Sequence, residues 1–163
     1  MSERYSVRLS KDYLVFSAGH FITYAGDVCE RLHGHNYQVV AEVHGPLDEN
    51  QYVVDFIALR DTLKAIIDDL DHRMLLPTRH PLIRVEADDR EVTARFAERR
   101  WVFPREDCAL LPIANTTAEL LARHIAGQLR DALATRLGAT PEVVRVEVDE
   151  TYGQWAACEL RDP

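Results

Sequence analysis

The segment "HGHNYQVVAEVH", residues 33–44, is the most informative part of the sequence, because it predicts a long β-strand that begins with two histidines. From His35 to His44 the apolar and polar residues alternate well enough for a strand in a sheet with one buried face. Side chains two residues apart point to the same face of a strand, so the rings of His33 and His35 share one side. The rest of the chain can be placed around this strand.

Further strands are predicted on both sides of this segment. The turn-forming residues of "GPLDEN" (45–50) end the strand. Apolar, strand-like patterns predict the start of a hairpin or a strand before it and a closing pair of strands near the end of the chain. These predicted strands cover residues 5–9, 13–18, 143–148 and 154–160.

Two amphipathic helices are predicted between these strands. The first covers about residues 56–70, with Asp55 as its N-cap. The second covers about residues 117–137, where Thr116 and Glu119 fit a capping box. The apolar stripe of the first helix consists of Phe56, Leu59, Leu63, Ile66 and Leu70.

Residues 77–114 separate the two helices and form a β-rich insertion. The segment "PLIRVEADDREVTARF" (81–96) predicts two strands around the turn "ADDR", and "RRWVF" (99–103) predicts a third short strand. Helices segregated from antiparallel strands indicate an α+β fold with the helices on one face of a sheet. We expect one domain over residues 1–163, with 77–114 as an inserted β-hairpin segment.

The composition excludes several classes of protein. A chain of 163 residues that is 47% hydrophobic suits one domain with a real core. A net charge of −8 argues against a broad nucleic-acid surface. No apolar run of about 18 residues predicts a membrane span, and the first residues lack the apolar core of a secretory signal, so a cytoplasmic protein is expected. Three cysteines without such a signal argue against a disulfide framework.

A metal site is predicted from three histidines. His20 ends the segment "FSAGH" with the parity of Phe16 and Ala18, so it points to the apolar face of its strand. Together with His33 and His35 it gives three nitrogens on two strands and one open position, which is typical of a catalytic zinc. The His-x-His pair alone is a weak signal in a chain with seven histidines.

Three further positions carry chemistry, and the sequence leaves each of them open. Cys29 either closes the zinc site as a fourth ligand or stands off the metal as a reactive thiolate. Asp71 and His72 form either an acid/base pair or an ordinary charged helix end. Glu150 continues the parity of the apolar strand 143–148. If the strand includes it, its carboxylate lies on the apolar face and needs a partner, such as a planar ligand group with two N–H donors. If the strand ends at residue 148, Glu150 lies in solvent.

Five segments together resemble one enzyme family. They are "FSAGH", "CERLHGHNY", "LDHRML", "NTTAELLA" and "VEVDET". In this order they resemble the 6-pyruvoyl-tetrahydropterin synthase family, which includes the 6-carboxytetrahydropterin synthases of queuosine biosynthesis. The resemblance implies the tunnelling fold (T-fold), a four-stranded antiparallel sheet with two helices on one face. It also implies a homo-oligomer, a trimer or a hexamer of two stacked trimers, with the site at a subunit interface.

The resemblance also implies a role for each of these residues. It implies zinc ligands at His20, His33 and His35, a catalytic base at Cys29 off the metal, a second acid/base unit at Asp71 and His72, and a pterin anchor at Glu150 with Thr116, Thr117 and Glu119 near it. Glu119 is already accounted for by the capping box.

The implied substrate is 7,8-dihydroneopterin triphosphate. The expected reaction is zinc-dependent formation of 6-carboxy-5,6,7,8-tetrahydropterin, with release of acetaldehyde and triphosphate. The alternatives are a 6-pyruvoyl product, action on another reduced pterin, and a non-enzymatic zinc- or pterin-binding module. Similar relatives in folate synthesis carry glutamate at the cysteine's position, so Cys29 argues against that branch. The insertion 77–114 lies outside the resemblance, and we expect it over or beside the pocket, where it changes substrate choice or adds subunit contacts.

Overall fold

A computed structural model of the chain describes residues 3–161. The elements, in chain order, are β1 (Tyr5–His20), β2 (Thr23–Tyr24), β3 (Val28–Cys29), β4 (His33–Gly45), α1 (Phe56–Asp68), β5 (Arg73–Pro77), β6 (Arg84–Ala87), β7 (Glu91–Phe96), β8 (Arg99–Pro104), η1 (Arg105–Asp107), β9 (Cys108–Leu111), α2 (Ala118–Leu137), β10 (Val143–Asp149) and β11 (Trp155–Arg161). Among these helices none is long and apolar enough to cross a membrane.

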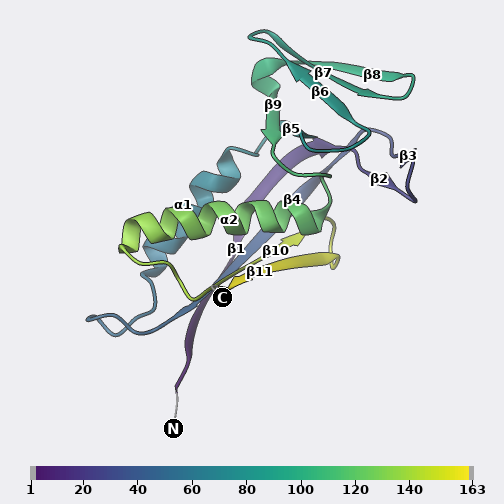
Figure 1. Cartoon of the computed structure of the whole chain (residues 1–163). Coiled ribbons are helices and arrows are strands. Elements are labelled where there is room, and N and C mark those ends of the chain that lie inside the picture. The colour runs from purple at the N-terminus through teal and green to yellow at the C-terminus, as the bar shows by residue number, and fades with distance from the viewer. Residues whose placement is uncertain (1–2, 162–163) are drawn as a thin grey trace.

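The main sheet has six strands in the order β11-β10-β4-β1-β5-β9. Its first four strands pair antiparallel, as the T-fold prediction requires, and both helices lie on one face of the sheet (Figure 1). The predicted α+β class is therefore confirmed. The expectation of only four strands is wrong, because β5 and β9 extend the sheet through parallel pairing with β1 and with each other. These two strands are only five and four residues long, which is too short for a reliable periodicity.

The pairing of β1 with β4 sets the geometry of the site. The two segments predicted at 5–9 and 13–18 form one strand with an irregularity between Ser10 and Val15. In this register His20 lies opposite His33, and Ala18 lies opposite His35. The end of β1 and the start of β4 thus bring all three histidines to one end of the sheet.

Helix α1 agrees with the prediction at its start and along most of its stripe. The Asp55 carboxylate accepts a hydrogen bond of 2.8 Å from the Ala58 N–H, so the predicted N-cap is confirmed. Leu59 and Leu63 are buried in the core. Phe56 is wrongly placed in the stripe, because its side chain in the first turn is 53% exposed and Ala58 faces the core instead.

Helix α2 does not have the predicted capping box. Its N-cap is Thr117, whose side chain makes no cap hydrogen bond. The hydroxyl of Thr116 donates to the carbonyl of Phe21 at 3.1 Å instead, because the residue is fully buried against the end of β1. Glu119 is exposed in the first turn, where a negative charge interacts favourably with the helix dipole.

The insertion forms a separate antiparallel sheet in the order β6-β7-β8, at the end of the molecule that also carries β2 and β3 (Figure 1). This agrees with two strands around the "ADDR" turn followed by a third. Its apolar side chains build a second small core with Phe21, Met74 and Leu76 of the main fold, and Cys29 packs against this core. The insertion therefore lies against the loop between β1 and β4, which leads into the first histidine of β4.

Gly34 makes close contact between β1 and β4 possible. A Cβ atom at this position would lie 2.9 Å from the carbonyl oxygen of Ala18. We expect Gly34→Ala to lower the free energy of unfolding by about 1–3 kcal/mol, because the backbones must move apart. Urea denaturation of the metal-free protein measures this.

The matched control is Gly127→Ala in α2, where a Cβ atom meets nothing within 4 Å. Alanine is the better helix former, so this variant should gain about 0.5–1 kcal/mol. Equal stability of Gly34→Ala and the unmodified protein would contradict the close approach.

Candidate metal centre and catalytic residues

The predicted histidine triad is assembled at the paired ends of β1 and β4. One nitrogen each from His20, His33 and His35 lies within 4.8 Å of the others. The His20 side chain is fully buried, whereas His33 and His35 are 35% and 22% exposed. The cluster is therefore anchored in the core and open to solvent on one side.

Backbone carbonyl groups fix the orientation of two of the rings. The Nδ1 atom of His20 lies 2.9 Å from the carbonyl oxygen of Thr116, and the Nδ1 atom of His33 lies 2.8 Å from that of Arg31. A carbonyl oxygen can only accept, so Nδ1 carries the proton and donates it, and Nε2 keeps a free lone pair that can bind a metal. Burial lowers the pKa of His20 to about 4, which keeps the ring in the neutral, metal-binding form.

These residues fit a zinc ion. Within residues 3–161, His20 Nε2 is a buried atom without a hydrogen-bond partner. The Glu150 Oε1 atom lies 3.4 Å from it, within ion-pair distance but without hydrogen-bond geometry. Buried polar atoms rarely stay without a partner, and three neutral imidazoles with an open position are the ligands of many catalytic zinc sites. The cluster contains no sulfur atom.

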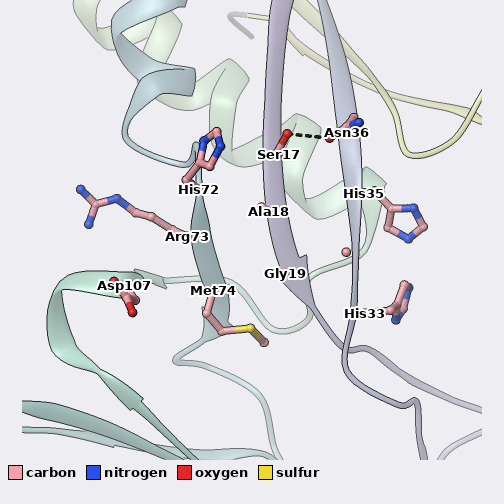
Figure 2. Close-up of a pocket in the computed structure, with 11 residues that line it drawn as sticks. Ser17, Ala18, Gly19, His33, His35, Asn36, His72, Arg73, Met74 and Asp107 are labelled. Carbon is pink, nitrogen blue, oxygen red and sulfur yellow. Dashed lines mark hydrogen bonds between the residues drawn. The ribbon is translucent and has the colours of Figure 1, made fainter.

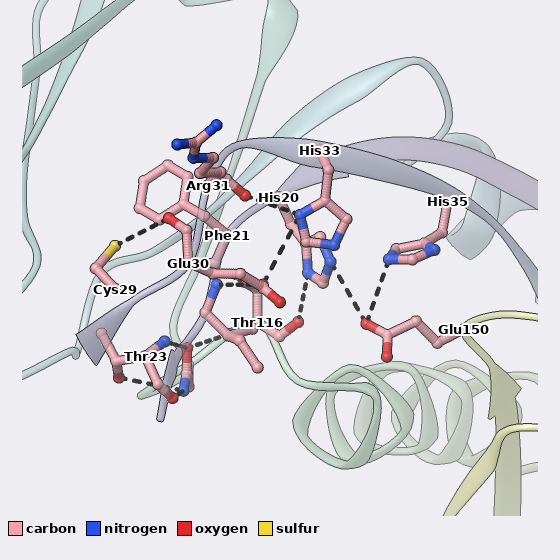
Figure 3. A network of polar contacts seen from close by, with 12 residues as sticks. His20, Phe21, Thr23, Cys29, Glu30, Arg31, His33, His35, Thr116 and Glu150 are labelled. Carbon is pink, nitrogen blue, oxygen red and sulfur yellow. Dashed lines mark hydrogen bonds and ion pairs between the residues drawn. The ribbon is translucent and has the colours of Figure 1, made fainter. Parts of the chain in front are cut away.

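Glu150 faces the triad from the end of β10. Its Oε1 atom lies 3.4 Å from His20 Nε2 and 3.8 Å from His35 Nε2, and its side chain is 28% exposed (Figure 3). Strand β10 ends at Asp149, and the predicted parity still directs Glu150 to the histidine side. A carboxylate in this place can contact both the triad and a ligand above it.

Sequence reasoning missed two residues at this centre, and the first is Tyr37. It stacks on Phe16 and lies edge-on to His20 and His35, with ring centroids 5.7 and 5.5 Å away. Its hydroxyl is buried and has no hydrogen-bond partner within the described part of the chain. Burial and the nearby Glu150 raise its pKa above the ordinary value. The signal was available, because Tyr37 continues the parity of the two strand histidines.

The second missed residue is Glu30. Its Oε2 atom lies 3.8 Å from His33 Nδ1 and accepts a hydrogen bond from the Ile22 N–H at 3.3 Å (Figure 3). The carboxylate thus stands beside the triad, held by the backbone that follows His20. Its place directly after Cys29 in "CERLHGH" was the available signal.

Cys29 lies outside the triad at the end of β3. Its thiol contacts the carbonyl oxygen of Glu30 at 3.5 Å (Figure 3). Burial raises the pKa of this thiol, the Arg99 guanidinium opposes the rise, and Glu30 adds to it. Burial therefore disfavours the thiolate, and a metal ion bound nearby would favour it, as the Arg99 guanidinium does.

Asp71 and His72 form the predicted pair. The His72 Nδ1 atom lies 2.9 Å from Asp71 Oδ2. Both residues are tied to Ser17 of β1: the Ser17 N–H donates to Asp71 Oδ1 at 2.7 Å, and the His72 N–H donates to the Ser17 carbonyl at 2.6 Å. The bond from Ser17 lowers the pKa of Asp71, and His72 lowers it further. The ring of His72 is 82% exposed, so it is free to contact a ligand.

Asp71 and His72 lead into β5 on one side of β1, whereas His33 and His35 belong to β4 on its other side and His20 ends β1 itself. One open pocket of about 650 Å³ is lined by His72 and Arg73 at the start of β5 and by His33 and His35 of β4, but not by Asp71 or His20 (Figure 2). The rings of His33 and His35 point away from this side, beyond β4 (Figure 2). One chain therefore does not direct His72 and the triad at the same point.

The threonines at the start of α2 lie close to the triad. Thr116 is fully buried, and its carbonyl and hydroxyl groups hold the His20 ring and the Phe21 backbone. Thr117 is half-buried, and Glu119 is exposed. Their predicted contacts with a pterin, and the catalytic roles of Cys29 and His72, stay predictions.

Comparison with known proteins gives consistent relatives. A family model described as 6-pyruvoyl tetrahydropterin synthase matches residues 9–161. A putative 6-carboxy-5,6,7,8-tetrahydropterin synthase of Methanocaldococcus jannaschii is 33% identical over 144 residues, 88% of each chain. The 6-carboxy-5,6,7,8-tetrahydropterin synthase of Aquifex aeolicus is 30% identical over 149 residues, 88% of this chain and 85% of the relative. The structure of Plasmodium falciparum 6-pyruvoyl tetrahydropterin synthase superimposes with a TM-score of 0.89 at 27% identity, covering 99% of this chain and 100% of that one.

Proposed function

The chain belongs to the 6-pyruvoyl tetrahydropterin synthase family and is an enzyme of that type, and we propose that it converts 7,8-dihydroneopterin triphosphate to 6-carboxy-5,6,7,8-tetrahydropterin. One water molecule is consumed, and acetaldehyde and triphosphate are the other products. The carboxypterin serves queuosine or related deazapurine synthesis. The names of the M. jannaschii and A. aeolicus relatives support this choice over a pyruvoyl product.

The proposal rests mainly on one observation: His20, His33 and His35 form an open cluster of three nitrogens, and the Cys29 thiol lies outside this cluster. A module that only stored zinc would favour a closed set of four ligands. A module that only bound pterin would need neither Cys29 nor the Asp71–His72 pair. The combination supports an enzyme over a binding module.

Each residue has a specific task in this proposal. Zinc held by His20, His33 and His35 would supply Lewis-acid catalysis toward the hydroxyl groups of the substrate side chain. Glu150 accepts the two parallel N–H groups of the pterin edge.

Proton transfer is assigned to the other two units. Cys29 removes a proton from the side chain of the substrate, and His72 exchanges a proton on the opposite side. Asp71 holds the His72 ring through its 2.9 Å contact and stabilises the protonated form.

We further propose a homo-oligomer, a trimer or a hexamer of two trimers, whose sites lie between subunits. The separation of His72 from the triad within one chain supports this arrangement, because a neighbouring subunit can bring its pair to the open side of the triad. Size-exclusion chromatography with light scattering measures the oligomer directly. A monomer with full activity would contradict it.

The position of Glu30 favours a second candidate reaction. Its carboxylate contacts the triad side, whereas the Cys29 thiol contacts a backbone carbonyl. With Glu30 as the base, the side chain of the same substrate would be cleaved differently, as the resemblance implies for the relatives of folate synthesis. The presence of Cys29 alone therefore does not exclude that branch.

Product analysis tests the proposal. Zinc-loaded protein is incubated with 7,8-dihydroneopterin triphosphate, and the products are separated and identified by mass spectrometry. We expect a 6-carboxypterin and an equal amount of acetaldehyde. A pyruvoyl product or a different cleavage product would replace the proposed reaction by one of the alternatives, and unchanged substrate would refute catalysis on this compound.

A further inference from the structure

Arg99 of the insertion reaches the loop that carries Cys29 and Glu30. Its Nη1 atom donates to the carbonyl of Cys29 at 2.7 Å, and its Nη2 atom donates to the carbonyl of Glu30 at 2.9 Å. Arg99 lies 70 positions from Cys29 and 69 from Glu30 in the chain, so the contact is purely tertiary. One guanidinium thus bridges two successive peptide units of the loop.

Aromatic stacking fixes the place of this guanidinium. The Arg99 Cζ atom lies 4.7 Å from the centroid of Trp101, and Trp101 stacks on Phe21 at 4.4 Å with an interplanar angle of 19°. Phe21 directly follows His20, the buried histidine of the triad. The contact with the Trp101 ring adds cation–π attraction and removes freedom from the long side chain. Packing against Trp101 therefore restricts the Arg99 side chain in the position from which it donates to the loop.

The alternation of β8 explains why these side chains point inward. Arg99, Trp101 and Phe103 are half-buried and face the main fold, whereas Arg100 and Val102 are exposed. The inward side belongs to the second core, against which Cys29 also packs. A strand of the insertion and the loop before β4 therefore form one packed unit.

We propose that Arg99 is a positioning residue, which clamps the carbonyls of Cys29 and Glu30 and so sets where the thiol and the carboxylate stand relative to the three histidines. The insertion 77–114 then contributes to the catalytic site through Arg99, which positions Cys29 and Glu30. The consequence for turnover rests on the proposed function, but the clamp itself does not.

The clamp depends on the shape of the guanidinium as well as on its charge. A planar fork with two parallel N–H donors can bridge two carbonyl groups, whereas an ammonium group is a point charge that holds one at a time. The charge of Arg99 also lowers the pKa of the Cys29 thiol against the opposing effects of burial and Glu30. Geometry and charge can therefore be separated by two substitutions at the same position.

The variants are Arg99→Gln, which removes the charge, and Arg99→Lys, which keeps it without the fork. The control is Arg100→Gln, on the same strand but outward and exposed, because its side chain makes no hydrogen bond or ion pair with the described residues. The first readout is the rate of Cys29 alkylation by iodoacetamide across a pH series, followed on the Cys29 peptide by mass spectrometry. The second is a comparison of kcat with KM. Circular dichroism and zinc content verify that each variant is folded and loaded.

We expect alkylation of Cys29 in Arg99→Gln to need a higher pH than in the unmodified protein. In Arg99→Lys the pH profile should return toward the original one, while kcat stays about 10–100-fold low because the loop is no longer fixed. Zinc content should be unchanged in all variants, and Arg100→Gln should behave as the unmodified protein in every readout.

Two results would overturn the clamp. One is an alkylation profile of Arg99→Gln that matches that of Arg100→Gln, and the other is full kcat in Arg99→Lys. If the protein turns over no pterin at all, the alkylation series still tests the role of Arg99. The proposed function and the role of Arg99 can therefore be refuted independently. If Arg99→Gln does not fold, Arg99→Lys with its retained charge provides the decisive comparison.

Discussion

Replacing His33 by alanine should weaken zinc binding by about a hundredfold or more and leave the fold intact. Four-ligand structural zinc sites bind with about 10–16 kcal/mol, so one ligand contributes roughly 3 kcal/mol, and each ~1.4 kcal/mol is a factor of ten. The His33 side chain is 35% exposed, so its loss removes little packing. Competition against a chromophoric chelator measures the affinity.

The matched control is His44→Ala, on the same strand β4. His44 lies outside the triad and pairs with Glu42 at 3.0 Å. This variant should bind zinc as the unmodified protein does. Undiminished zinc affinity in His33→Ala, or an equal loss in both variants, would contradict the assignment of the metal site to the triad.

Replacing Cys29 by alanine should remove turnover and leave zinc in place. A positioned acid or base contributes about 10²–10⁴-fold to the rate, so kcat should fall by that factor. The thiol is not part of the cluster of metal-binding nitrogens, so the zinc content should not change. Single-turnover product formation and zinc analysis of the same sample measure both quantities.

Cys158→Ala is the control, because this half-buried thiol lies on β11 and packs against the main core. It should keep full activity. Loss of zinc in Cys29→Ala would make Cys29 a ligand. Full activity in Cys29→Ala, together with an inactive Glu30→Gln, would transfer the role of base to Glu30.

The parts of the fold that follow from local pattern could be predicted from the sequence. The alternation after His35 predicted β4, and Asp55 predicted the start of α1. Parity alone placed the three histidines on one face, because the side-chain period of a strand is fixed by its geometry. The structure brings the rings together through the register of β1 and β4.

The remaining features depend on contacts between distant segments. Strand β9 pairs with β5 because the chain comes back to the main sheet after the insertion. No local sequence pattern predicts this pairing. The Thr116 hydroxyl bonds to Phe21, which lies 95 residues away, so a capping box with the right spacing did not form. The bond from Arg99 to Cys29 is of the same kind. Local signals find residues that carry chemistry, whereas the residues that position them are found only in three dimensions.

X-ray absorption at the zinc edge distinguishes an open site from a closed one, because it identifies the atoms bound to the metal in the loaded protein. Zinc–nitrogen and zinc–oxygen distances lie at about 2.0–2.1 Å, and zinc–sulfur distances at about 2.3 Å. An open site of His20, His33 and His35 with Cys29 off the metal predicts a shell of nitrogen and oxygen only. A sulfur atom at the longer distance would contradict it and make the site a closed one with Cys29 as its fourth ligand.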